Sequence, residues 1–158
     1  GITEAAIYRH FPSKRKIYSG LVDFCEQSLL ELIGNINKTD QEPLVKVKKI
    51  LLLLISFSEK NPGLAKLLTR EAFSSEEAIL DERIILLFSK IELLIKQNLQ
   101  KFEQATKKKM SLTTASSANL LLATTEGLIQ QFVRSGFVER PSSRTSEQID
   151  LIISALTS

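Results

Sequence analysis

Apolar residues recur at helical spacing along almost the whole chain, and short polar or proline-containing stretches separate the runs. None of the runs shows the sustained alternation of apolar and polar residues that indicates a half-buried strand. Proline stands at or beside four of the breaks, where its fixed φ and missing N–H interrupt a helix. The pattern predicts an all-α protein with helices at residues 4–11, 14–36, 43–60, 64–73, 76–104, 113–136 and 146–156.

The longest uninterrupted apolar run, residues 50–55, covers less than two helical turns, far below the roughly 18 residues of a membrane span. It predicts a helix that neighbours bury on most sides. The single cysteine, Cys25, excludes an internal disulfide. The single cysteine and the lack of a visible signal peptide lead us to expect a cytoplasmic protein. The length of 158 residues predicts one domain with a sizeable core.

The excess positive charge is confined to the start of the chain. The net charge is +3, and residues 1–20 contain four basic side chains against Glu4 alone. This distribution predicts that the basic end meets a polyanion, with a chance run of solvated lysines as the alternative. A second basic run, residues 107–109, is typical of a solvated loop, although contact with DNA or another anion is the alternative there.

Residues 1–16 have the layout of a recognition helix followed by the start of the next helix. The first turn of a recognition helix needs small or polar side chains so that its backbone can enter the major groove, and its far end needs phosphate donors. Thr3, Glu4, Ala5 and Ala6 meet the first requirement, and the candidates for phosphate contacts are Tyr8, Arg9, His10 and Lys14.

Residues 7–14, with the sequence IYRHFPSK, resemble the signature "LYxHFxxK" that closes the helix-turn-helix of TetR-type regulators. The resemblance implies that Tyr8, His10 and Lys14 contact phosphates and that Arg9 contacts either phosphates or bases. It also assigns the base edges to Thr3, Glu4 and Ala5. It also implies a TetR-like helical bundle, with residues 1–16 as the remainder of the DNA-binding domain and 17–158 as the core and dimerisation domain. We expect the first two helices of the motif to lie outside this chain.

Further stretches resemble one branch of that family, the nucleoid occlusion factors: residues 3–14, 51–69 and 131–137, the last followed by Arg140-Pro141. This resemblance implies a nucleoid-associated homodimer that binds double-stranded DNA and inhibits cell division by binding FtsZ. It assigns the FtsZ tail to Phe24, Leu53, Lys60 and Asn61, whereas plain core packing is the alternative for the first two. Leu32 departs from the basic residue typical of the branch, which puts part of the electrostatic contact in doubt.

The last third of the chain is poor in charge, with seven charged side chains among the 49 residues from 110 to 158. Two of its helices could pair with their copies in a four-helix dimer interface. The alternative is that both complete the core of one chain. The predicted interface residues are Leu121, Leu128, Phe132, Ile149, Ile152, Ile153 and Leu156.

Three other functions compete with this interpretation. A ligand-responsive TetR-type repressor would hold an effector between residues 50–57 and 120–132, near Thr124, Thr125 and Glu126. An enzyme is disfavoured, because one histidine and one cysteine occur without a recognised catalytic motif, and no cofactor or metal is expected. A helical interaction module that has lost DNA binding is the third.

Overall fold

The computed structural model describes residues 14–72 and 78–158, and in these ranges every regular element is helical. The predicted all-α fold is therefore confirmed, while the predicted helix at residues 4–11 lies outside the described residues. The elements are α2 (Lys14–Asn37), α3 (Pro43–Lys60), α4 (Pro62–Leu68), α5 (Ala78–Thr106), α6 (Thr114–Arg134), the short 3-10 helix η2 (Pro141–Ser143) and α7 (Thr145–Thr157). None of the described helices is long and apolar enough to cross a membrane.

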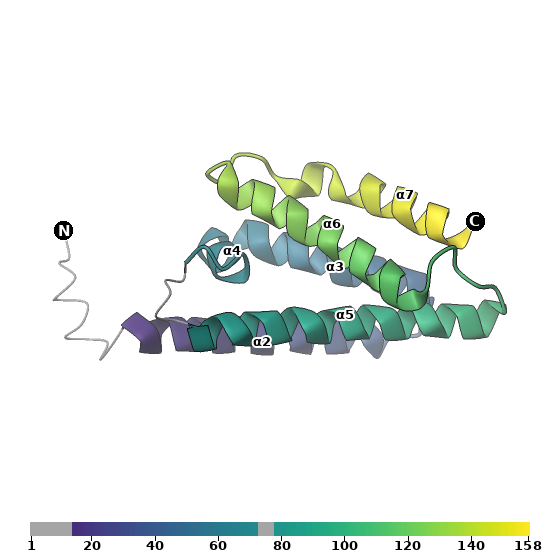
Figure 1. The fold of residues 1–158 in the computed structure, drawn as a ribbon, viewed down its shortest axis with the longest axis horizontal. Helices are drawn as coiled ribbons and strands as arrows, with labels where there is room; N and C mark the ends of the chain where they lie inside the picture. The colour runs from purple at the N-terminus through teal and green to yellow at the C-terminus, as the bar shows by residue number, and fades with distance from the viewer. Residues whose placement is uncertain (1–13, 73–77) are drawn as a thin grey trace.

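Helix α3 occupies the centre of the bundle and touches every other described element. In Figure 1, α2 and α5 run side by side along one edge, α6 crosses above them, and α7 forms the opposite edge. The central position explains the apolar run at residues 50–55, because neighbours cover most of the circumference of α3. Ile50, Leu51, Leu54 and Ile55 are all at most 1% exposed, as the sequence predicted.

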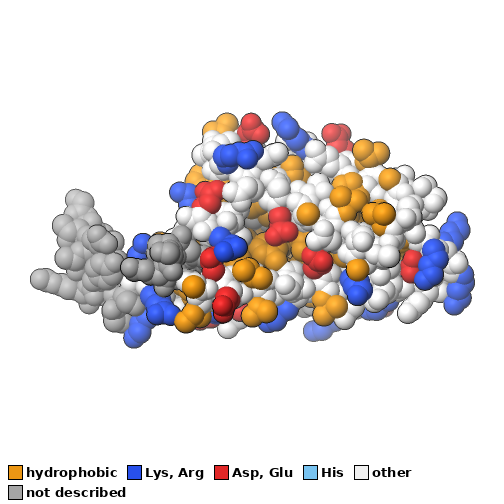
Figure 2. Space-filling model, in the orientation of Figure 1, with side chains coloured by type: hydrophobic (Ala, Val, Ile, Leu, Met, Phe, Trp, Pro, Cys, Tyr) orange, Lys and Arg blue, Asp and Glu red, His pale blue; other side chains and the backbone are white. Residues whose placement is uncertain are grey.

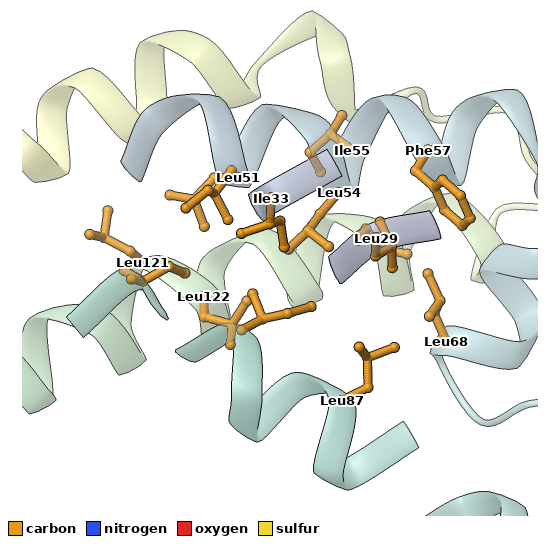
Figure 3. Close-up of a cluster of buried hydrophobic side chains, with 14 of the residues drawn as sticks. Leu29, Ile33, Leu51, Leu54, Ile55, Phe57, Leu68, Leu87, Leu121 and Leu122 are labelled. Carbon is orange, nitrogen blue, oxygen red and sulfur yellow. The ribbon is translucent and has the colours of Figure 1, made fainter. Parts of the chain in front are cut away.

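The core is formed where four helices from distant parts of the chain meet. Figure 3 shows Leu29 and Ile33 of α2 close to Leu54 of α3, with Leu87 of α5 and Leu122 of α6 beneath them. Each of these side chains is at most 1% exposed. Burying such a side chain contributes about 1.5–3 kcal/mol, so this shared core stabilises the packing of α2, α3, α5 and α6 against one another.

Two helix ends differ from the prediction for local reasons. Helix α4 begins at Pro62, since proline is favoured in the first turn, where no N–H is needed. It ends at Leu68, and Arg70 follows with a left-handed φ of 66°. Helix α6 ends before Gly136 and Phe137, whose φ angles are also positive, and the Phe137 N–H donates to the Phe132 carbonyl at 2.8 Å. This is the geometry in which glycine commonly ends a helix.

Candidate functional site

The first turn of α2 is strongly basic. Lys14, Arg15 and Lys16 are exposed, and the Lys14 ammonium lies 5.4 Å from the centre of the Tyr18 ring. The turn holds no acidic residue. Because a helix N-terminus already carries partial positive charge, added cations are unfavourable there unless an anion is bound. The arrangement therefore suits a phosphate-bearing ligand, with Lys14 as the predicted contact. Thr3, Glu4, Ala5, Tyr8, Arg9 and His10 lie outside the described residues.

One side of α2 is fixed to α5 by charged groups. An Arg83 Nη lies 2.5 Å from Asp23 and 3.1 Å from Glu26, and the Lys90 ammonium lies 3.0 Å from Glu26. These partners, Lys90 first and Arg83 second, lower the pKa of Glu26. At the far end of α2, the Asn98 amide donates to the Asn37 side chain at 2.9 Å. The helix that carries the basic turn is thus held to the body along its length.

The opposite side of α2 exposes an apolar row beside α3. Leu21, Phe24 and Leu32 are 36%, 53% and 41% exposed, and their spacing places them on one helix face. Phe24 is thus a surface residue, so the interpretation of this side chain as core packing is wrong. Sequence reasoning had not assigned Leu21 to this face.

Helix α3 completes this surface. The Lys46 ammonium donates to the Asn37 carbonyl at 3.1 Å, which shows the side of α3 that turns toward α2. Leu53 lies two turns later on the same side and is half-buried, and Lys60 lies two further turns along and is exposed. The structure therefore brings Phe24, Leu53 and Lys60 to one face. We refer to the set Leu21, Phe24, Leu32, Leu53 and Lys60 as the α2/α3 surface.

Asn61 has a structural role at the end of this surface. Its side-chain amide donates to the Phe57 carbonyl at 2.9 Å, and its backbone N–H donates to the same carbonyl at 3.1 Å. Its own carbonyl accepts from the Ala65 N–H at 3.0 Å. Asn61 thereby ends α3 and starts α4, which fixes the backbone position of Lys60.

The residues predicted for the dimer interface lie mainly inside one chain. Ile152 and Ile153 are partly buried, whereas the remaining five are at most 7% exposed: Leu121, Leu128, Phe132, Ile149 and Leu156. The outward face of α6 and α7 instead carries Leu120 and Leu151, which are 41% and 72% exposed. Figure 2 shows hydrophobic side chains gathered over this part of the molecule. A hollow of about 390 Å³ between the two helices is lined by Ala123, Gly127, Leu151 and other residues.

The interior offers little room for an effector. Residues 50, 51, 54 and 55 fill the core, and the hydroxyls of Thr124 and Thr125 donate to carbonyls of their own helix, at 2.8 and 3.0 Å. A hollow of about 140 Å³ is lined in part by Leu68, Phe88 and Glu126. Burial, and then the neighbouring Glu92, raise the pKa of Glu126. This hollow is small compared with the several hundred Å³ of an ordinary ligand pocket.

The single cysteine does not have the environment of an activated nucleophile. Cys25 is fully buried, and burial raises the pKa of its thiol to about 11. No group of three His, Cys, Asp or Glu residues placed to hold a metal ion occurs in residues 14–72 and 78–158.

Comparison with known proteins shows clear similarities. Residues 41–157 match the family model of the SlmA-like, tetracyclin repressor-like C-terminal domain. The chain is 43% identical over 148 residues to "Nucleoid occlusion factor SlmA" of Shewanella sediminis, a match that covers 94% of the chain and 75% of the relative. The corresponding identity is 44% for the Shewanella woodyi protein of the same name, with the same coverage. It is 38% for that of Alteromonas mediterranea, covering 94% of the chain and 76% of the relative.

Proposed function

The chain belongs to the SlmA-like branch of the TetR-type regulators, and from this membership we propose that it is a nucleoid occlusion factor that binds DNA as a dimer and inhibits cell division by binding FtsZ. Its place in the cell is then the cytoplasm, on the nucleoid. The observation that carries the FtsZ part is the exposure of Phe24 on the surface where Leu53 and Lys60 also lie. Because Phe24 is 53% exposed, a partner that covers it removes apolar surface from water, which favours binding.

DNA binding is supported by the basic first turn of α2. In the proposal, Lys14 contacts a phosphate beside the recognition helix, together with Tyr8, His10 and Arg9, while Thr3, Glu4 and Ala5 face base edges. Phosphate contacts give affinity without sequence preference, and contacts to base edges supply the specificity.

The FtsZ tail is assigned to the α2/α3 surface. Phe24 and Leu53 supply apolar contact area, and Lys60 supplies a cation for an acidic group of the peptide. Asn61 contributes by holding the helix end at which Lys60 stands.

Dimerisation is assigned to the outward face of α6 and α7. The predicted set of Leu121, Leu128, Phe132, Ile149, Ile152, Ile153 and Leu156 supports this face from inside, and Leu120 and Leu151 extend it into solvent. Leu151→Glu would place a charge at the centre of the face, and we expect sedimentation to show a monomer. Leu86→Glu on α5, where Leu86 is 59% exposed, is the matched control and should leave the dimer intact.

The decisive experiment titrates an FtsZ tail peptide into the full-length protein with and without specific DNA. We expect saturable binding that is lost on Phe24→Ala or Lys60→Glu while the dimer remains. Leu86→Ala and Lys108→Glu make matched changes to exposed residues elsewhere and should bind like the wild type. If the wild type bound no peptide in either condition, the FtsZ part would be refuted, and a TetR-type DNA-binding protein with another effector would remain.

A further inference from the structure

Helix α3 carries four lysines, and the structure gives them different roles. The Lys46 ammonium donates to the Asn37 carbonyl at 3.1 Å, and the Lys48 ammonium lies 2.6 Å from Asp150 of α7. Lys49 and Lys60 are exposed, and among the described residues neither side chain forms an ion pair or a hydrogen bond. These two cations are therefore available to a ligand.

Both cations lie on the side of α3 that borders α2. Lys49, Leu53, Ser56 and Lys60 follow one another at i, i+4, i+7 and i+11, which is a single row along a helix. The contact of Lys46 with Asn37 sets the side that this row occupies, and it also shows that α3 starts where α2 ends. Because the helices run in opposite directions, Lys49 lies toward the Leu32 end of the α2/α3 surface and Lys60 toward the Phe24 end.

Helix α2 supplies few cations to this surface, because Lys14, two turns before Leu21 on the same side, is the predicted DNA contact. Between Lys16 and Lys38 it contains no basic residue. Its Asp23 and Glu26 are engaged by Arg83 and Lys90 on the α5 side, and Glu31 is exposed near the outer edge of the surface. Beyond Lys14, an acidic ligand that covers Leu21, Phe24 and Leu32 must therefore find its positive partners on α3.

We propose that Lys49 is a second cationic anchor of the α2/α3 surface, and that Lys49 and Lys60 together select an acidic peptide with a defined spacing of its acidic groups. The eleven residues from Lys49 to Lys60 correspond to about 16 Å along the helix axis. Two carboxylates of the peptide would stand at about that separation, on either side of an apolar centre that covers Phe24 and Leu53. This separation corresponds to roughly five residues of extended peptide or roughly eleven residues of helix. The inference rests on the proposed function and adds a specificity-determining residue to it.

The test measures binding of the FtsZ tail peptide to full-length Lys49→Gln and Lys49→Glu, at several salt concentrations. We expect Lys49→Gln to weaken binding roughly 2- to 5-fold, the range of an exposed ion pair, and Lys49→Glu to weaken it further. The salt dependence of affinity should become shallower, because one charge pair is lost. Lys108→Glu makes the same charge change on the loop between α5 and α6, outside the α2/α3 surface, and should leave affinity and salt dependence unchanged.

A second series replaces each acidic residue of the peptide by its amide. In Lys49→Gln, one of these replacements should no longer lower the affinity of the peptide. In Lys60→Gln, a different replacement should no longer lower it. The two positions should differ by the spacing stated above.

If Lys49→Glu bound like the wild type while Phe24→Ala and Lys60→Glu lost binding, the second anchor would be refuted and the proposed function would stand. If both lysines coupled to the same acidic residue, the spacing rule would be refuted. If the wild type bound no tail peptide, the FtsZ part of the proposed function and the inference would fall together.

Discussion

The attachment of α2 to α5 gives a prediction whose size and pH dependence follow from the structure. Glu26 accepts from Lys90 at 3.0 Å and from Arg83 at 3.1 Å, and its side chain is 26% exposed. Glu26→Gln keeps the shape of the side chain and removes the charge. Partly exposed ion pairs contribute about 0.2–1 kcal/mol each, so losing both should lower the free energy of unfolding by about 1 kcal/mol. For a domain of this size, that is about 2–4 °C in Tm.

The pH dependence has a definite sign. Lys90 and then Arg83 lower the pKa of Glu26 in the folded protein. A carboxylate with a lowered folded-state pKa stabilises the fold above its unfolded pKa, about 4.3, and this stabilisation is lost as the pH falls through the folded-state value. The loss in the free energy of unfolding caused by Glu26→Gln should therefore be complete at neutral pH and should shrink below pH about 4. It should also shrink in 1 M salt, where the Debye length is about 3 Å.

The assay is urea unfolding of both proteins at fixed protein concentration, at neutral and acidic pH and at two salt concentrations. Glu31→Gln on the same helix is the matched control, because Glu31 is exposed and forms no ion pair among the described residues. Its stability should stay close to that of the wild type. A deficit of Glu26→Gln that persisted unchanged at acidic pH, or an equal deficit in Glu31→Gln, would refute the electrostatic account.

Three further predictions concern the basic first turn of α2, the core and the cysteine. Lys14→Ala should weaken DNA binding by about 1 kcal/mol or more on specific and random duplexes alike, measured by anisotropy at several salt concentrations, and a change in sequence preference alone would contradict the phosphate assignment. Leu51→Ala removes a fully buried side chain and should destabilise the fold by about 2–5 kcal/mol in urea unfolding; a loss below about 1 kcal/mol would contradict the tight packing of α3. Cys25, with its thiol pKa raised to about 11, should resist a thiol reagent at neutral pH in the native protein and react rapidly in denaturant; fast native labelling would contradict its burial.

The helices could be predicted from the sequence, whereas the outward face of each helix could not. In α2, the row Val22, Cys25 and Leu29 and the row Leu21, Phe24 and Ser28 have the same helical spacing and are rotated by one residue. The structure buries the first row and exposes most of the second. Spacing alone favours neither row, and only the packing of α3 and α5 against α2 decides between them.

The dimer residues illustrate the same limit. Leu121 and Ile149 follow the strongest apolar period of their helices, and that period marks the core of the single chain, where both are 0% exposed. The outward face is marked by weaker signals, such as the small residues Ala123 and Gly127 and the isolated Leu151. The shortage of charge predicted apolar faces on these two helices, although it did not show which side chains face the core of the chain and which face outward.

The proposed DNA and peptide sites share α2, and their separation predicts how they influence each other. Lys14 and Phe24 are ten residues apart, which is about 15 Å along the helix. DNA phosphates and an acidic peptide repel each other, yet at physiological salt the Debye length is about 8 Å and most of this repulsion is screened.

Both ligands should therefore bind together in about 0.15 M salt. At about 0.01 M salt, where the Debye length is about 30 Å, DNA should lower the affinity of the protein for the peptide. Peptide titrations with and without specific DNA at both salt concentrations measure this effect. A DNA effect of equal size at both concentrations would show instead that the sites communicate through the position of α2 rather than through charge.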